Sequence, residues 1–195
     1  MRLMKPNRTQ SSSNPKSSVR QVALLRGINV GRAKRVAMAD LRALVEDLGF
    51  GEVRTLLNSG NVVFTAPGTA PGDAAAAIEK ALVQRTGVSS RVTVLTAAEL
   101  AAAVDENPLL DVAHDHTRLL VSVLTNPADR SKLEPLVKQD WTPEVLALGA
   151  RVAYLWCPEG LLASRLPEAV GRALGDAVTT RNWATLTKLH ALAAG

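Results

Sequence analysis

The sequence has little cysteine, few aromatic residues and no long hydrophobic run. Its single cysteine, Cys157, cannot form an internal disulfide, so a disulfide-built secreted domain is excluded and a reducing, cytoplasmic location is expected. No apolar stretch approaches the roughly 20 residues of a membrane span, which argues against a membrane protein. Aromatic residues make up 3% of the chain, so few side chains are available for stacking on nucleic-acid bases.

Acidic residues are missing from the first twenty positions, and this determines the charge of the chain. The basic residues of that segment are Arg2, Lys5, Arg8, Lys16 and Arg20. The whole chain of 195 residues has a formal charge of +5, so residues 21–195 are electrically balanced. Residues 1–20, rich in Ser, Asn and Pro, are predicted to be a disordered tail. This tail is explained as a solvated extension or as the result of a start codon assigned too far upstream. The alternative is a basic arm that binds an acidic partner.

The hydrophobic pattern and the turn residues give the order strand, helix, strand, turn, strand, helix, strand twice along the chain. The first copy covers residues 21–95. Its strands are predicted at 22–28, 53–57, 62–64 and 92–95, and its helices at 38–48 and 73–87. Ser59-Gly60 is predicted to form a two-residue hairpin turn, and Asp73 to cap the second helix.

A linker, residues 96–117, separates the two copies. In it, Thr96 and Glu99 match a capping box for a short helix. The second copy covers residues 118–195. Its strands are predicted at 119–124, 145–148, 152–156 and 177–180, with helices from Pro127, near 168–174 and over 183–192. Pro167 either lies in the first turn of the middle helix or kinks one that begins earlier.

This pattern predicts an α+β protein of two tandem ferredoxin-like lobes, each an antiparallel four-stranded sheet with helices on one face. The strand at 152–156 is apolar on both of its faces. Val152, Tyr154 and Trp156 alternate there with Ala153, Leu155 and Cys157. Something must therefore cover the face without helices. The other lobe is the simplest cover, the linker helix or a second chain being alternatives, and Trp156 is expected to be buried there.

Two polar loops of the first copy are predicted to lie at one end of its sheet. The RGINVG loop, residues 26–31, follows the first strand, and residues 58–61 join the second strand to the third. Both loops should reach the N-terminus of the first helix, where free backbone N–H groups favour an anion. The candidate ligand-binding residues at this end are Arg26, Asn29, Gly31, Lys34, Arg35, Asn58, Ser59 and Asn61.

A purely structural interpretation stands beside this one. In it the loop glycines only shape turns, while Asn29 and Asn61 bond their own backbone. The RGINVG loop is not a Walker loop, because its glycine spacing differs and no Lys-Ser/Thr pair follows the second glycine.

The second distinctive segment is TTRNW, residues 179–183. Its hydroxyl, guanidinium and amide groups could hold a carboxylate, a phosphate or a base, which makes Thr180, Arg181 and Asn182 candidate ligand-binding residues. In the structural alternative, Thr180 and Asn182 are helix caps, and Arg181 braces the two lobes. The sequence does not establish whether this segment and the RGINVG loop share one cleft.

The other reactive side chains do not indicate a metal site or a catalytic site. His114-Asp115-His116 lacks a fourth metal ligand, so no metal is predicted, and Cys157 is expected to be buried and inert. No nucleophile elbow, zincin helix or dinucleotide fingerprint is present, and no cofactor is predicted. Enzymatic activity is therefore neither supported nor excluded.

The sequence resembles the bacterial family of domain of unknown function 1697 in two runs. The first, residues 22–64, contains LRGINVG and SGNVVF, and the second, residues 177–193, contains TTRNW. The resemblance extends from Gln21 onward and implies a duplicated ferredoxin-like fold without an established activity. Three places depart from the family pattern. Arg32 stands where a glycine is usual, residues 161–169 lack the usual Gly-x-Ser-Lys-Leu stretch, and the tail is additional.

The leading functional hypothesis is a soluble cytoplasmic binding module for a small anionic or nucleotide-like ligand. One alternative is an RNA or single-stranded nucleic-acid binding protein, since ferredoxin-like sheets can present aromatic residues to bases. Another is an enzyme acting on an anionic substrate, for which a general base is missing. The sequence gives no indication of the oligomeric state.

Overall fold

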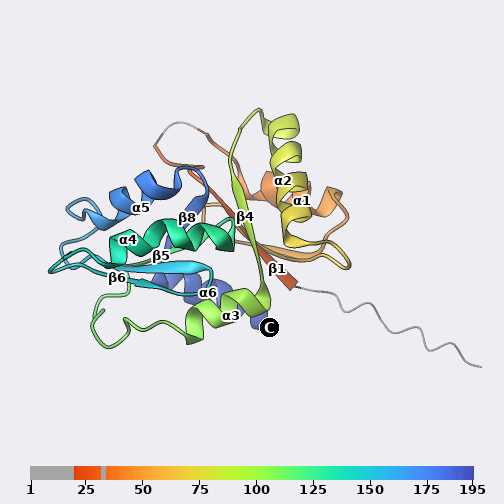
Figure 1. The fold of residues 1–195 in the computed structure, drawn as a ribbon. Helices are drawn as coiled ribbons and strands as arrows, with labels where there is room; N and C mark the ends of the chain where they lie inside the picture. Colours follow the sequence, from red (N-terminus) through yellow and green to blue (C-terminus); the bar gives the residue numbers. More distant parts are fainter. Residues whose placement is uncertain (1–19, 32–33) are drawn as a thin grey trace, which may run out of the picture.

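The computed structural model describes residues 20–31 and 34–195. It is an α+β structure with two four-stranded antiparallel sheets and, within the described residues, six α-helices (Figure 1). The first sheet has the strand order β2-β3-β1-β4. Its strands are β1 (Arg20–Leu25), β2 (Gly51–Leu56), β3 (Asn61–Thr65) and β4 (Val92–Thr96).

The second sheet repeats this arrangement with the order β6-β7-β5-β8. Its strands are β5 (Leu119–Leu124), β6 (Val145–Leu148), β7 (Val152–Trp156) and β8 (Val178–Asn182). In both sheets the first strand of the copy lies between the third and the fourth. The predicted α+β class with two antiparallel sheets is therefore confirmed.

Helices cover the outer face of each sheet. On the first sheet these are α1 (Met38–Asp47) and α2 (Pro71–Thr86); on the second they are the 3₁₀ helix η1 (Pro127–Leu133), α4 (Glu134–Val137) and α5 (Leu166–Leu174). Their apolar sides are buried on alternate strand residues, as amphipathic packing requires. Phe64 and Ile78 belong to the first of these cores, and Leu155 and Val170 to the second. We call each sheet with its outer helices a lobe.

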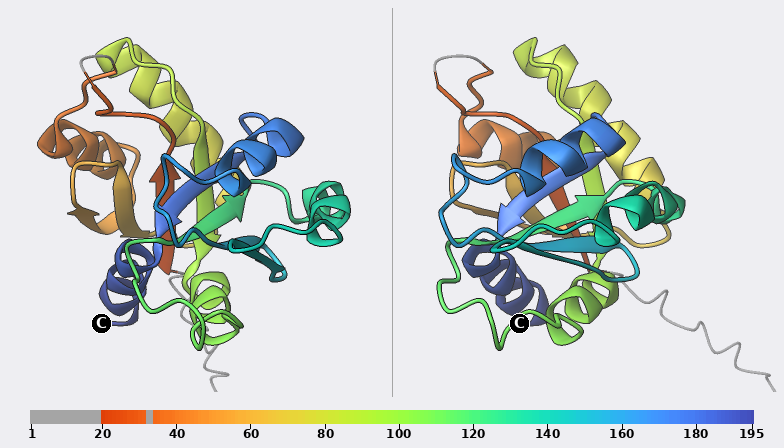
Figure 2. Two further views of the ribbon diagram at one scale, coloured as in Figure 1. Left: turned by 90° about the vertical axis from the view of Figure 1, so that its left-hand side faces the viewer. Right: turned by 60° about the vertical axis from the view of Figure 1, so that its left-hand side comes forward.

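A third core lies between the lobes. Val22 and Leu24 of β1 belong to it together with Val121 of β5 and Tyr154 of β7. The helices α3 (Ala97–Asp105) and α6 (Trp183–Ala194) pack on each other and complete this core below both sheets (Figure 2). The other lobe and these two helices thus cover the sheet faces that lack outer helices. Trp156 lies at the margin and is only partly buried, because its strand ends there.

The alternation predicted for β7 is confirmed. Val152, Tyr154 and Trp156 face the core between the lobes, whereas Ala153, Leu155 and Cys157 face the outer core of the second lobe. The capping box is also confirmed, since the Thr96 hydroxyl accepts from the Glu99 N–H and the Glu99 carboxylate accepts from the Thr96 N–H.

Several local predictions were wrong by a few residues. The β2–β3 turn has four residues, 57–60, instead of two, and α2 begins at Pro71 without a capping Asp73, because proline suits the first helical turn. The helix predicted from Pro127 is a 3₁₀ helix as far as Leu133 and becomes α-helical only in α4. Of the two alternatives for Pro167, the first is confirmed, since this proline lies in the first turn of α5.

The predicted tail falls mostly on residues 1–19, which lie outside the described residues. Its last residue, Arg20, is the first of β1; its guanidinium donates to the Ala193 carbonyl at 3.0 Å and pairs with Glu52 at 2.6 Å. Within the described residues, none of the helices is both long and apolar enough to cross a membrane.

Candidate functional site

A cleft between the lobes holds two adjoining cavities, of about 770 and 270 Å³, and both are lined by Arg26 and Gly27. The larger cavity extends along α2 and β4. The smaller one lies against α5 and β8 and is also lined by Thr179, Thr180 and Arg181. The RGINVG and TTRNW segments, far apart in the sequence, therefore meet in one cleft.

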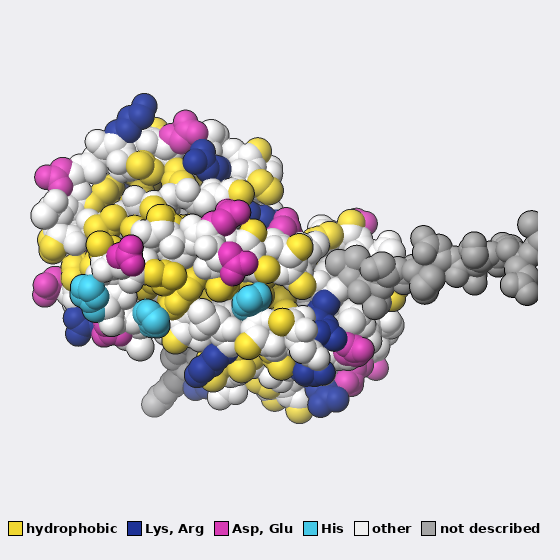
Figure 3. Space-filling model, turned by 90° about the horizontal axis from the view of Figure 1, so that it is seen from below, with side chains coloured by type: hydrophobic (Ala, Val, Ile, Leu, Met, Phe, Trp, Pro, Cys, Tyr) yellow, Lys and Arg dark blue, Asp and Glu magenta, His cyan; other side chains and the backbone are white. Residues whose placement is uncertain are grey.

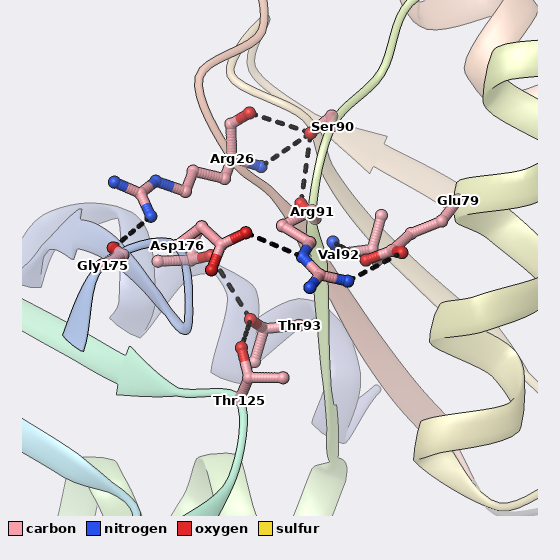
Figure 4. A network of polar contacts seen from close by, with 10 residues as sticks. Arg26, Glu79, Ser90, Arg91, Val92, Thr93, Thr125, Gly175 and Asp176 are labelled. Carbon is pink, nitrogen blue, oxygen red and sulfur yellow. Dashed lines mark hydrogen bonds and ion pairs between the residues drawn. The ribbon is translucent and has the colours of Figure 1, made fainter. Parts of the chain in front are cut away.

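Arg26 is held at the end of β1 by its own backbone. Its N–H donates to the Arg91 carbonyl at 2.9 Å and to the Ser90 hydroxyl at 3.1 Å, and that hydroxyl donates to the Arg26 carbonyl at 2.8 Å. The guanidinium crosses to the second lobe and donates to the Gly175 carbonyl at 2.5 Å (Figure 4). Arg26 forms no ion pair with any described carboxylate.

The larger cavity contains both signs of charge. Arg91 pairs with Asp176 of the second lobe at 3.1 Å and with Glu79 of α2 at 3.5 Å (Figure 4). The hydrogen bond and charge of Arg91 lower the pKa of Asp176, so this carboxylate is ionised at neutral pH. Lys34 and Lys80 also line the cavity and form no ion pair with a described acid. The cavity therefore keeps a net positive charge.

Arg181 joins the lobes at the smaller cavity. It is on β8, and its Nε donates to the Asn61 side-chain oxygen at 2.6 Å. One terminal nitrogen donates to the carbonyls of Leu25 at 2.7 Å and Ser59 at 2.8 Å, and the other to the Thr180 carbonyl at 2.9 Å. These four bonds use four of its five N–H groups. The structural interpretation of Arg181 as a brace agrees with this geometry.

The charge of Arg181 has only neutral partners among the described residues. All four acceptors are carbonyl or amide oxygens. Burial lowers the pKa of Arg181 to about 10, so the group remains a cation at neutral pH. A partly buried cation without a carboxylate partner favours an anion nearby, since attraction between charges is stronger where water is partly excluded.

Hydroxyl groups connect the sheets behind the smaller cavity. The Thr93 hydroxyl on β4 lies 2.9 Å from that of Thr125 and 3.3 Å from that of Thr179 on β8. Within the second sheet, Thr180 shares a hydrogen bond of 2.8 Å with Ser122 on the neighbouring strand β5. Thr93 and Thr179 are buried, whereas Thr180 is exposed, so Thr180 is the hydroxyl best placed to reach a ligand.

The outer wall of the smaller cavity is α5, which contributes Pro167, Val170 and Gly171. Its start is fixed by Glu144, a buried carboxylate that accepts from the N–H groups of Arg165 and Leu166, both at 3.0 Å. Burial alone would raise the pKa of Glu144, but these bonds and the Ser164 hydroxyl lower it below its ordinary value. The carboxylate therefore serves as a charged cap of this helix.

The other predicted residues lie at a separate cavity of about 440 Å³ beside the start of α1, lined by Asn29, Arg35 and Asn58 among others. Asn29 donates to the carbonyls of Val36 at 2.9 Å and Asn58 at 2.7 Å, which confirms that the two loops are neighbours. The Asn29 side-chain oxygen accepts from the Val36 N–H at 2.9 Å. The amide of Asn29 therefore forms hydrogen bonds with backbone groups of these loops.

The predicted cluster is therefore divided. Arg26 and Lys34 line the cleft between the lobes, whereas Asn29 and Asn58 lie near α1. Asn61 is buried and holds the hairpin, donating at 2.9 Å to the Leu56 carbonyl and to the Ser59 hydroxyl. Asn182 caps α6 by accepting from the Thr185 N–H at 2.9 Å. Gly31 has a φ of 60°, which is typical of a loop glycine.

Four charged residues of the cleft, Glu79, Lys80, Arg91 and Asp176, carried no recognisable sequence signal. Lys80 and Glu79 are on an ordinary amphipathic helix, and Asp176 follows the glycine that ends α5. Their position is a consequence of how the lobes pack, which only the three-dimensional structure shows. The strand predicted at 177–180 is β8 and extends to Asn182, so the alternating residues of TTRN point to different sides of that strand.

The remaining candidates stay apart from the cleft. His114 and His116 are exposed, and histidines occupy the face seen from below in Figure 3 among charges of both signs. Within the described residues, no three His, Cys, Asp or Glu side chains form a group that could hold a metal. Cys157 is buried, and burial raises the pKa of its thiol, so it is a poor nucleophile.

Comparison with known proteins gives a family and a fold. Residues 19–154 match the model of the family described as protein of unknown function DUF1697. The conserved bacterial protein SP0830 from Streptococcus pneumoniae has a similar structure, with a TM-score of 0.73 at 23% sequence identity, covering 91% of this chain and 99% of its own. No curated protein matches. The chain belongs to the DUF1697 family of proteins of unknown function.

Proposed function

We propose that this protein is a cytoplasmic binding module for a small anionic or nucleotide-like ligand, which occupies the cleft between two ferredoxin-like lobes around Arg26. The observation that carries the proposal is the meeting of the RGINVG and TTRNW segments at two cavities with excess positive charge. Arg26 is central because it lines both cavities and its guanidinium forms no ion pair with a described carboxylate, although its charge helps to lower the pKa of Asp176.

The charges of the cleft support this ligand class. Its basic side chains are Arg26, Lys34, Lys80, Arg91 and Arg181, against the acids Glu79 and Asp176. Guanidinium groups bind phosphate and carboxylate through paired hydrogen bonds, and ammonium groups bind phosphate as point charges. A ligand that carries such a group would neutralise charge that the protein leaves uncompensated.

The two alternatives have less support. An RNA-binding sheet needs exposed aromatic residues, but Tyr154 is fully buried, donates its hydroxyl to the Ala103 carbonyl at 2.8 Å, and has its pKa raised to about 12 by burial. For an enzyme, the cleft offers cations but its two carboxylates are engaged with Arg91, which leaves the general base unidentified.

Isothermal titration with inorganic phosphate and with AMP tests the proposal. Wild-type protein should bind at least one of them, and Arg26→Ala should weaken that binding about tenfold or more, as expected for a lost hydrogen bond to a charged group. Arg42→Ala is the matched control, because it removes the same charge from the exposed Arg42–Glu46 pair on α1. Equal binding by wild type and Arg26→Ala would contradict the proposal.

A further inference from the structure

The two cavities differ in size in a way that restricts the ligand. Small-molecule sites usually measure about 300–1,000 Å³. The larger cavity, of about 770 Å³, falls within that range, whereas the smaller, of about 270 Å³, does not reach it. The smaller cavity therefore suits one group of a ligand whose remainder extends past Arg26 into the larger one.

Each cavity has its own uncompensated positive charge. The smaller cavity has Arg26 and Arg181 and no acidic lining residue. In the larger cavity, both acids are engaged with Arg91. Glu79 is further occupied, because it accepts from the Val92 N–H at 2.8 Å. The larger cavity then has two more cations than acids, and the cations that pair with no described acid are Lys34, Lys80 and the shared Arg26.

Lys34 and Lys80 line only the larger cavity, whereas Arg181 lines only the smaller one. Lys80 shares one face of α2 with Ala76 and Val83, because residues three and four apart are neighbours on a helix, and all three line the larger cavity. Arg181 is instead on β8 of the second lobe, and Lys80 does not line the cavity of Arg181. One compact anion therefore does not fill both places.

From these observations we infer that the ligand carries two separated anionic groups, one beside Arg26 and Arg181 and the other beside Lys34 and Lys80, as a sugar bisphosphate does. This inference rests on the proposed function, since it assumes that the cleft binds an anion. Beyond the proposed function, it specifies that the ligand has two anionic groups. It places the second group beside residues that the sequence motifs do not contain.

The test compares fructose 1,6-bisphosphate with fructose 6-phosphate by isothermal titration at one fixed ionic strength. The bisphosphate should bind about tenfold more tightly, as an additional charged hydrogen bond implies. Lys80→Ala should abolish this preference and leave the affinity for the monophosphate within about twofold. Arg85→Ala removes a charge from the same helix outside the cleft, where Arg85 pairs with Asp47, and should keep the preference.

The outcomes separate this inference from the proposed function. Equal affinity of wild type for the two sugars would overturn the inference, and so would an equal loss for both sugars in Lys80→Ala. If neither sugar binds while AMP or phosphate binds in a manner that depends on Arg26, the inference fails and the proposed function stands. Both fail if no anion binds. Lys80 is exposed and alanine favours helix, so the variant should remain folded.

Discussion

Of the arginines that cross between the lobes, Arg151 and Arg181 differ most clearly in how their charge is compensated. Arg151, at the β6–β7 turn, pairs with the Glu99 carboxylate and donates to the Val94 carbonyl at 3.0 Å. Arg181, on β8, reaches the carbonyls of Leu25 and Ser59 and the amide of Asn61, and no described carboxylate. Both brace the lobes, but only the Arg181 junction adjoins the positively charged cleft.

The difference between Arg151 and Arg181 distinguishes an arginine that only holds the lobes together from one that can also bind a ligand. A buried cation that only has to hold two lobes together is better stabilised with a carboxylate partner, because removing charges from water is costly. The Arg151 junction follows this rule. The Arg181 junction satisfies its hydrogen bonds but leaves its charge available to a ligand, so stability and anion affinity can be tested independently.

Removing Arg181 should produce the largest loss of stability. Arg181→Met leaves buried acceptors on Leu25, Ser59 and Asn61 without a donor, and unsatisfied buried groups cost about 1–3 kcal/mol each, partly relieved by water. We expect a decrease of roughly 3 kcal/mol in the free energy of unfolding, measured with urea. A decrease below about 1 kcal/mol would show that the brace contributes little.

Distorting the hairpin that receives Arg181 should cost somewhat less. A Cβ at Gly60 would lie 2.7 Å from Ile28 Cδ1 and 2.7 Å from Leu25 Cβ, and the φ of Gly60 is +76°. Gly60→Ala should therefore destabilise the protein by about 2 kcal/mol through overpacking and backbone strain. Gly68→Ala is the control, because it also has a positive φ of 72° but no atom within 4 Å. Equal losses in both variants would show that contact with Leu25 and Ile28 is unimportant.

The Arg151 junction should be sensitive to acid. Burial alone would raise the pKa of Glu99, but hydrogen bonds from Thr96 and the guanidinium of Arg151 lower it below its ordinary value of 4.5. Because the pKa is lower in the folded state, this stabilisation is complete above the unfolded pKa and disappears as pH falls through the folded value.

Glu99→Gln measures this contribution, which we expect to be about 1 kcal/mol for a partly exposed pair. The difference in unfolding free energy between wild type and Glu99→Gln should be present at pH 7 and shrink below pH 4.5. A difference that stays constant from pH 7 to about pH 3 would show that ionisation of Glu99 does not stabilise the fold.

Much of the fold could be predicted from the sequence because the local signals were consistent. The bounds of β5, β6 and β7 agree with the apolar runs, and the capping box at Thr96 and Glu99 marks the start of α3. Apolar residues on both faces of β7 also indicated that a second layer must cover the sheet face without outer helices. The four-residue β2–β3 turn could not be anticipated, since Ser59-Gly60 alone resembles a shorter turn.

The candidate site was predictable only in part. Arg26 and Arg181 are marked by distinctive segments, but their common cleft depends on how one lobe is oriented on the other. Lys80 has no motif, and Asn29 was grouped with Arg26 because sequence order does not show which way each side chain leaves its loop. Positions within a lobe follow from its topology, whereas contacts between lobes depend on packing.

The most direct measurement compares Thr180→Asp with Thr180→Asn in anion binding. Thr180 is exposed in the cavity of Arg26 and Arg181, and the two replacements have the same shape but differ by one negative charge. Thr180→Asp adds a carboxylate to a cavity that has no acidic lining residue. Titration with phosphate or AMP should show binding by the asparagine variant and a loss of about tenfold or more in the aspartate variant. Equal affinities in the two variants would contradict the claim that uncompensated charge in this cleft binds an anion.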